Sequence, residues 1–317
     1  MSNVLLLRSP GAAADLPDRY ESAFQSRGYH PVSVPVLETA YVNLHELKDI
    51  VVRGPGKQGH DGVVITSGRS AEAWKIVVLQ LVEEDPTGGE DESDSDATWA
   101  SVPFYVVGEA TARALRDIRE IVGEYPYVPK DIRGASESGT GEKLARFILR
   151  DLGEKAKGAR LLYLTGDKNR DTLPRILGEA GVTLGAIQVY ETRGSSKFEA
   201  DLKEAMHEVR SGGKVSELEQ KALHSESTDR WWIVYFAPSD AECANPTLRN
   251  HFALSFTDAP PVASGGKPAP RIAAIGPTTG SFLRDNLAMR VDIVSPAPNP
   301  ESSAQAIAGF DASHPWS

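Results

Sequence analysis

Short apolar runs alternate with helical patterns along the 317-residue chain. Each run is rich in β-branched and aliphatic residues, and is followed by a turn of Gly, Ser, Thr or Pro and then by a stretch of helical periodicity. This is the pattern of strand–loop–helix units in a parallel sheet. It predicts an α/β fold. The predicted strands are residues 4–7, 63–65, 104–107, 161–164, 231–235 and 272–275.

The runs and their following turns recur in the same order. The segment VVITSGRSAEAW from Val63 resembles IVYFAPSDAECA from Ile233, and YVVGEATARAL from Tyr105 resembles AAIGPTTGSFL from Ala273. Both pairs have almost the same separation, which indicates the duplication of one α/β unit. The order leaves open whether each half of the chain forms its own domain or whether the halves exchange strands. Continuous domains are the simpler expectation.

Three polar or Pro/Gly-rich segments interrupt the repeat and are predicted to be insertions outside the core. They are residues 83–98, 197–229 and 258–270. The first is acidic and poor in apolar residues, so we expect a solvated, disordered loop.

Charge and hydropathy limit the possible partners. The net charge is −10 and the chain has no Lys/Arg run, so no nucleic-acid partner is expected. The longest apolar stretches are too short for a membrane span or a signal-peptide core, which predicts a soluble, cytoplasmic protein without membrane contact.

The single cysteine, Cys243, allows no internal disulfide and is expected to be a buried thiol. We expect no metal or cofactor, and a monomer is the simplest oligomeric state.

Small and hydroxyl residues follow the predicted strands. Ligands of open parallel sheets bind beyond the carboxyl ends of the strands, where helix N-termini present unpaired N–H groups. Such residues also cap helices in most proteins, so one loop alone would indicate little. Five matched loops favour a site with many hydrogen-bond donors. They begin at Thr66, Gly108, Gly166, Ala237 and Gly276. No Walker loop, dinucleotide fingerprint, nucleophile elbow or HExxH pair is present.

The ordered motifs match those of a known family. They are VVITSGRSAEAW, YVVGEATARAL, LLYLTGDKNRDTLP with VYET, FAPSDAE, AAIGPTTGSFL and VSPAPNPESSAQAI. Together they resemble uroporphyrinogen-III synthases over residues 4–310, apart from the three interrupting segments. The resemblance implies two similar flavodoxin-like, parallel-sheet domains with a cleft between them. One would comprise residues 1–37 plus 194–317 and the other residues 38–193, joined by linker strands at about 34–41 and 187–193.

The resemblance also implies a cofactor-free reaction of tetrapyrrole and heme biosynthesis. Hydroxymethylbilane would lose water and close to uroporphyrinogen III, with ring D inverted through a spiro intermediate. Tyr190, in VYET, matches the family's tyrosine near the cleft and would be the catalytic residue that assists the departing hydroxyl. The substrate's carboxylates would be bound by Thr66, Ser67, Arg69, Thr111, Gly166, Lys168, Arg170, Ser239, Thr278 and Thr279.

Two further points stay open at this stage. Where the family often has Ser-Pro, this chain has Ala237-Pro238, so Ser239 would have to supply the hydroxyl of that loop. Arg8, at the end of the first predicted strand, is a further possible contact. A two-domain cytosolic protein that binds a tetrapyrrole or another polycarboxylate without catalysis is the alternative function.

Overall fold

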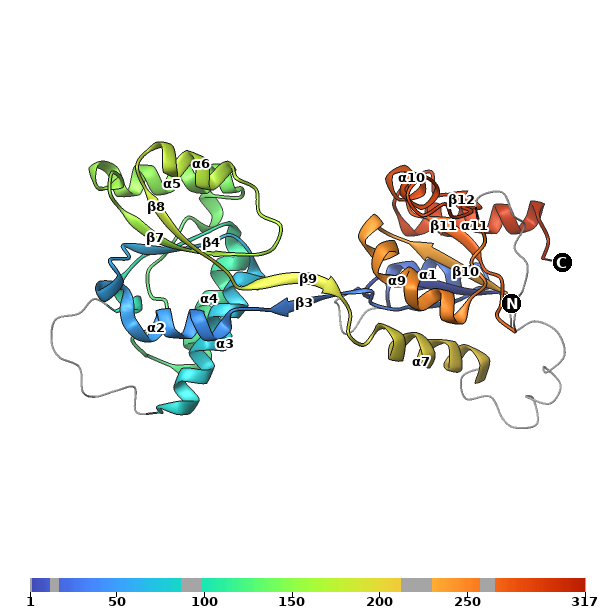
Figure 1. The fold of residues 1–317 in the computed structure, drawn as a ribbon, viewed down its shortest axis with the longest axis horizontal. Helices are drawn as coiled ribbons and strands as arrows, with labels where there is room; N and C mark the ends of the chain where they lie inside the picture. The colour runs from blue at the N-terminus through green and yellow to red at the C-terminus, as the bar shows by residue number, and fades with distance from the viewer. Residues whose placement is uncertain (1, 12–16, 87–97, 212–229, 257–265, 317) are drawn as a thin grey trace. The chain divides into compact units, whose positions relative to one another are not determined.

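The chain forms two compact units, each built around one parallel sheet. The computed structural model describes residues 2–11, 17–86, 98–211, 230–256 and 266–316. Unit 1 comprises Met1–Glu38 and Arg193–Ser317, and unit 2 comprises Thr39–Thr192. Each unit has a five-stranded parallel sheet with helices on both faces (Figure 1). The predicted α/β fold with parallel sheets is confirmed.

Unit 2 packs its helices into two hydrophobic cores, one on each face of the sheet. Successive residues of a strand point to opposite faces, so Val63 and Ile65 enter one core and Val64 enters the other. The sheet order is β6-β5-β4-β7-β8, with β4 (Gly62–Ile65), β5 (Phe104–Val106), β6 (Ile132–Arg133), β7 (Arg160–Thr165) and β8 (Thr183–Gln188). One face carries α2 (Leu44–Gln58), α3 (Gly68–Glu84) and α4 (Gly108–Val122), and the other carries α5 (Gly141–Leu152) and α6 (Thr172–Glu179).

Unit 1 has the same layered construction. Its sheet order is β12-β11-β10-β1-β2, with β1 (Asn3–Leu7), β2 (His30–Ser33), β10 (Trp231–Tyr235), β11 (Arg271–Ala274) and β12 (Ile293–Val294). One face carries α7 (Phe198–Ser211), α9 (Pro238–His251) and α10 (Pro277–Asp285), and the other carries α1 (Arg19–Gln25) and α11 (Pro300–Ser313). Among the described helices, none combines the length and apolar character needed to cross a lipid bilayer.

The two halves of the chain exchange strands. β1, from the first half, pairs in parallel with β10 from the second half, and β7 pairs in parallel with β4. The simpler expectation of two continuous domains is therefore wrong. In chain order the strands of unit 1 lie as 2-1-3-4-5, the order of flavodoxin, and unit 2 has the same order when its strands are numbered from β7.

Two strands connect the units. β3 (Leu37–Tyr41) and β9 (Tyr190–Gly194) pair as a separate two-stranded sheet. Glu38 accepts hydrogen bonds from Arg193 Nε at 3.0 Å and from the Ser196 N–H at 3.2 Å. The predicted linker near residue 187 starts too early, because residues 187–188 still belong to β8.

The segments predicted as insertions differ in outcome. α7 lies within 197–229 but belongs to the core of unit 1, since Phe198, Leu202 and Met206 are buried against the sheet. That part of the prediction is wrong. The segment is mostly polar, but its few apolar residues recur at helical spacing and form one buried face of α7. α3 extends to Glu84, so the start of the predicted loop 83–98 is helical. Residues 87–97, 212–229 and 257–265 lie outside the described residues.

The cysteine prediction is also wrong. Cys243 is exposed on α9. The residues of α9 that face the core are Ala241, Ala244 and Leu248, which recur at the helical period. Position 243 falls outside that stripe, and its side chain therefore faces outward.

Candidate functional site

The carboxyl edge of the sheet in unit 2 carries most of the predicted site residues. β4 and β7 are neighbours at the centre of the sheet, and the helices that follow them, α3 and α6, pack on opposite faces. In flavodoxin-like sheets such a pair of strands is the switch point at which ligands bind. The loop after β4 holds Thr66 and Ser67, and Arg69 follows in the first turn of α3. The loop after β7 holds Gly166 to Arg170.

Tyr190, the first residue of β9, packs against these two loops. Its ring lies directly over Gly166: a Cβ on Gly166 would stand 2.3 Å from Tyr190 Cζ and 2.6 Å from the phenolic oxygen. The Arg69 guanidinium lies 4.5 Å from the centroid of the Tyr190 ring, and Arg69 Nη1 donates to Thr192 Oγ1 at 3.0 Å. Residues from three elements therefore hold one phenol ring in place.

A chain of hydroxyl groups leads to the Tyr190 oxygen. Ser67 Oγ donates to Tyr190 Oη at 3.3 Å, and it also accepts the Ser70 N–H at 3.2 Å as the N-cap of α3. Ser70 Oγ lies 3.1 Å from Ser67 Oγ and donates to the Leu164 carbonyl at 3.2 Å. Because Ser67 supplies the proton of its bond to Tyr190, the phenolic proton of Tyr190 can be donated to a ligand.

The remaining predicted residues of unit 2 have different surroundings. Thr66 hydrogen-bonds the Tyr163 hydroxyl; burial raises the pKa of Tyr163, and the Thr66 bond opposes that rise. Thr111 is buried in the first turn of α4, so its side chain packs within the unit. Lys168 and Arg170 are exposed in the loop after β7.

Asn169 anchors the loop that carries Lys168 and Arg170. Its Nδ2 donates to the Gly166 carbonyl at 2.5 Å, and its Oδ1 accepts the Gly166 N–H at 3.3 Å. Sequence reasoning missed this role, as it missed those of Ser70 and Thr192. All three are common polar residues, and only their partners distinguish them.

Unit 1 places the other three predicted residues at the equivalent edge. Ser239 is half-buried in the first turn of α9, and Thr278 is exposed at the start of α10. Thr279 is buried, and its Oγ1 donates to the Phe236 carbonyl at 3.3 Å. Thr279 and Thr111 are corresponding positions of the repeat, and the burial of both indicates that they support the loops from within.

Asp240 is a further residue whose role the sequence analysis missed. It lies in the first turn of α9, and burial raises its pKa to about 6, although a hydrogen bond from the Ala237 N–H opposes the rise. A carboxyl group with this pKa is partly protonated in mildly acidic solution. An acidic residue at a helix start is common, and only the buried position of Asp240 sets it apart.

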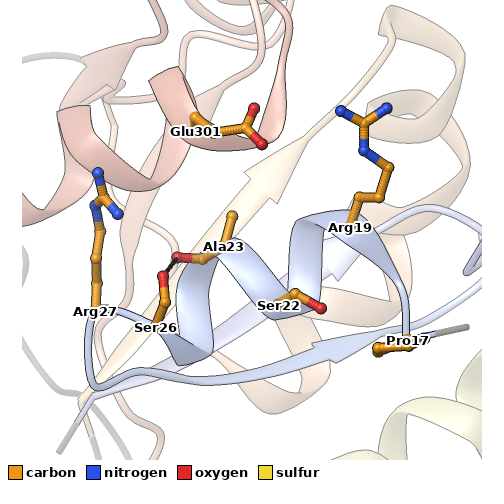
Figure 2. Close-up of a pocket in the computed structure, with 7 residues that line it drawn as sticks. All are labelled: Pro17, Arg19, Ser22, Ala23, Ser26, Arg27 and Glu301. Atoms are coloured by element: carbon orange, nitrogen blue, oxygen red, sulfur yellow. Dashed lines mark hydrogen bonds between the residues drawn. The ribbon is translucent and has the colours of Figure 1, made fainter.

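Two surface hollows lie apart from the Tyr190 site. One, of about 490 Å³, is lined by residues that precede β4, β5 and β7, at the amino edge of unit 2, and its Arg133 is already bonded to Asp131 and Asp151. The other, of about 310 Å³, lies between α1 and the start of α11, lined by Arg19 and Arg27 at the two ends of α1 and by Glu301 of α11 (Figure 2). Neither contains Tyr190 or the hydroxyl groups bonded to it.

Comparison with known proteins identifies the family. The family model described as uroporphyrinogen-III synthase HemD matches residues 18–305. The chain is 29% identical to the uroporphyrinogen-III synthase of Schizosaccharomyces pombe, over 98% of each chain, and 26% identical to that of Saccharomyces cerevisiae, over 96% of this chain and 94% of the relative. The crystal structure of uroporphyrinogen-III synthetase from Helicobacter pylori matches 98% of this chain and 100% of its own, at 16% identity and a TM-score of 0.41. Because the family model spans nearly the whole sequence, the chain belongs to the uroporphyrinogen-III synthase family.

Proposed function

We propose that this chain is a uroporphyrinogen-III synthase, a hydro-lyase that closes hydroxymethylbilane with loss of water and inversion of ring D. The observation that carries the proposal is the Tyr190 site of unit 2. There a phenol is held by Gly166 and Arg69, and its oxygen accepts a hydrogen bond from Ser67, which leaves the phenolic proton available for donation. Such a group suits the first step of the reaction.

The first step breaks the bond between the terminal methylene carbon and its hydroxyl oxygen. Tyr190 donates its proton toward that oxygen, which leaves as water with the bonding electron pair. The cationic methylene is then attacked by the substituted carbon of ring D, which forms the spiro intermediate. The bond between that carbon and the methylene of ring C breaks, and the released methylene is attacked by the unsubstituted α-carbon of ring D, which closes the macrocycle. Loss of a proton from this α-carbon restores the aromaticity of ring D, and that proton can return to Tyr190, so no cofactor is consumed.

The many carboxylates of the substrate require cationic groups and N–H donors. In unit 2 the exposed Lys168 and Arg170 supply positive charge, and the first turn of α3 supplies N–H groups. In unit 1 the first turns of α9 and α10, with Ser239 and Thr278, offer further donors. The cleft between the units, the cytoplasmic location and the monomeric state stay predictions.

The test of the function is the isomer of the product. Purified protein supplied with enzymatically generated hydroxymethylbilane is expected to yield the type III isomer, separated from the type I isomer by chromatography after oxidation. Spontaneous closure gives the uninverted type I isomer. Type I alone, combined with saturable binding of the linear substrate, would support the non-catalytic binder instead.

The test of Tyr190 is its replacement by phenylalanine. Tyr190→Phe keeps the ring over Gly166 but removes the donor, and since a positioned acid contributes about 10²–10⁴-fold, we expect kcat to fall by about 100-fold with KM nearly unchanged. Tyr105→Phe is the matched control, because that buried tyrosine of unit 2 bonds Asp151 instead. An unchanged kcat in Tyr190→Phe would remove Tyr190 from this role.

A further inference from the structure

The sheet of unit 1 also has a switch point, and an arginine, Arg8, lies in the loop next to it. β1 and β10 are the central neighbours of its sheet, and α1 and α9, which follow them, pack on opposite faces. This is the pair of strands that corresponds to β7 and β4 of unit 2. Arg8 follows β1 directly, and Phe236 follows β10. Arg8 therefore occupies the place where a ligand of this fold is expected.

Two aromatic rings hold the Arg8 guanidinium. Its central carbon lies 4.9 Å from the centroid of the Tyr20 ring and 5.6 Å from that of Phe236. The two rings pack edge to face, with centroids 5.0 Å apart, and the Tyr20 hydroxyl donates to the Pro298 carbonyl at 3.4 Å. These contacts restrict the long arginine side chain before any ligand arrives, which lowers the entropy cost of binding.

Asp18 fixes the orientation of Arg8 without using all of its donors. Arg8 Nη1 donates to Asp18 Oδ2 at 2.7 Å. The Asp18 carboxylate also accepts the N–H groups of Gly11 at 2.6 Å, Tyr20 at 2.9 Å and Glu21 at 3.1 Å. Burial alone would raise the pKa of Asp18, but the hydrogen bonds from Arg8 and these N–H groups outweigh it, so Asp18 stays ionised.

The ion pair leaves part of the Arg8 side chain exposed to solvent. The Asp18 side chain is 5% exposed, whereas that of Arg8 is 22% exposed. A guanidinium has five N–H donors, and within the described residues Asp18 engages one of them. The partly exposed remainder of the fork matches the two oxygens of a carboxylate.

We propose that Arg8 binds a carboxylate of the substrate at the carboxyl edge of unit 1. The proposal depends on the proposed function, because it assigns to unit 1 a preorganised anion-binding residue for the same polycarboxylate. Tyr20, Phe236 and Asp18 act as positioning residues for Arg8. An arginine that served only to tie β1 to the start of α1 would show the same ion pair, so the experiment must separate ligand binding from folding.

The experiment compares Arg8→Gln and Arg8→Lys with wild type in steady-state kinetics. Because Arg8 would contact a carboxylate remote from the breaking bond, the loss should appear in KM. We expect KM for hydroxymethylbilane to rise about 10–100-fold in Arg8→Gln, with kcat within about threefold of wild type. Arg8→Lys keeps the charge and the pairing with Asp18 but loses the fork, so its KM should rise about 5–10-fold at an unchanged melting temperature. The dependence of kcat/KM on ionic strength should weaken in Arg8→Gln only.

The matched control is Arg19→Gln. Arg19 is the exposed first residue of α1, next to Asp18, and lines the hollow between α1 and α11 (Figure 2). Its KM should equal that of wild type. An unchanged KM in both Arg8 variants, or a lower melting temperature as their only defect, would overturn the proposal. If Arg8→Gln does not fold, the KM and melting temperature of Arg8→Lys test the proposal. Failure of the proposed function would look different, since wild type itself would then produce no type III isomer.

Discussion

Gly166→Ala is expected to remove nearly all synthase activity while unit 2 stays folded. The added Cβ would stand 2.3 Å from Tyr190 Cζ, far inside van der Waals contact. The backbone of Gly166 has little freedom to move, because Asn169 bonds both its N–H and its carbonyl, and β7, which precedes it, is paired on both sides. The Tyr190 ring must therefore swing away, which breaks its bond to Ser67 and its contact with Arg69.

The loss should exceed that of Tyr190→Phe. Displacement of the ring removes the proposed donor and also alters the proposed substrate site around it, so kcat should fall by about 100-fold or more. Overpacking of this kind costs about 1–3 kcal/mol of stability, which thermal unfolding will report. Initial rates of type III formation, measured beside near-ultraviolet circular dichroism, separate the two effects.

Two variants control for indirect causes. Gly178→Ala introduces the same methyl group in α6, where nothing lies within 4 Å, and should leave the rate unchanged. In a Tyr190→Ala background the ring is absent, so Gly166→Ala should cause no further loss. A rate above half that of wild type for Gly166→Ala, or an additive loss in the Tyr190→Ala background, would contradict the explanation.

Arg271→Met should cause the largest loss of stability in unit 1. Arg271, the first residue of β11, forms an ion pair with Asp311 of α11, and the two side chains are only 10% and 16% exposed. Arg271 also donates to the His314 carbonyl at 2.6 Å, and its guanidinium lies 3.9 Å from the centroid of the Trp316 ring. Removal of one partner leaves a buried, uncompensated carboxylate, which costs about 3–5 kcal/mol.

Asp311 also accepts hydrogen bonds from a tyrosine and a tryptophan, so the stability of this part of unit 1 depends on its position. The Tyr29 hydroxyl donates to Asp311 at 2.8 Å and Trp232 Nε1 donates to it at 3.1 Å, and burial together with the Asp311 bond raises the pKa of Tyr29. Trp232 and Trp316 border the ion pair, so tryptophan fluorescence during urea unfolding includes a signal from this region, together with that of Trp74 and Trp99 in unit 2. Arg271→Met should shift the midpoint of the transition that this fluorescence reports to lower urea.

The control for Arg271→Met is an ion pair at the surface. Arg175 pairs with Glu179 on α6, but both side chains are more than 60% exposed, so Arg175→Met should cost less than about 0.5 kcal/mol. The double variant Arg271→Met/Asp311→Asn should be less destabilised than the sum of the single variants, because no charge is left unpaired. A loss below about 1 kcal/mol in Arg271→Met would show that solvent reaches the remaining carboxylate.

The central strands could be predicted from the sequence because burial on both faces of a strand requires consecutive apolar residues. β1, β4, β5, β7, β10 and β11 are covered on both faces and appear as continuous apolar runs. The edge strands β2, β6, β8 and β12 are partly exposed and have mixed sequences, so none of them appears as a continuous apolar run. The helical pattern of α7 was recognisable, but its place in the core was missed for a related reason, since its apolar stripe is sparse.

The sequence by itself determined the α/β class, the repeat, the family resemblance and the loops in which the candidate site residues lie. The resemblance implied that β1 and β10 share a domain, but only the tertiary structure showed their direct pairing, the position of Tyr190 over Gly166, and the burial of Thr111 and Thr279. The physical reason is the range of the interactions. Apolar runs and turns depend on neighbouring residues, whereas the partner of a strand and the contacts of a loop depend on pairing between segments that are far apart in the chain.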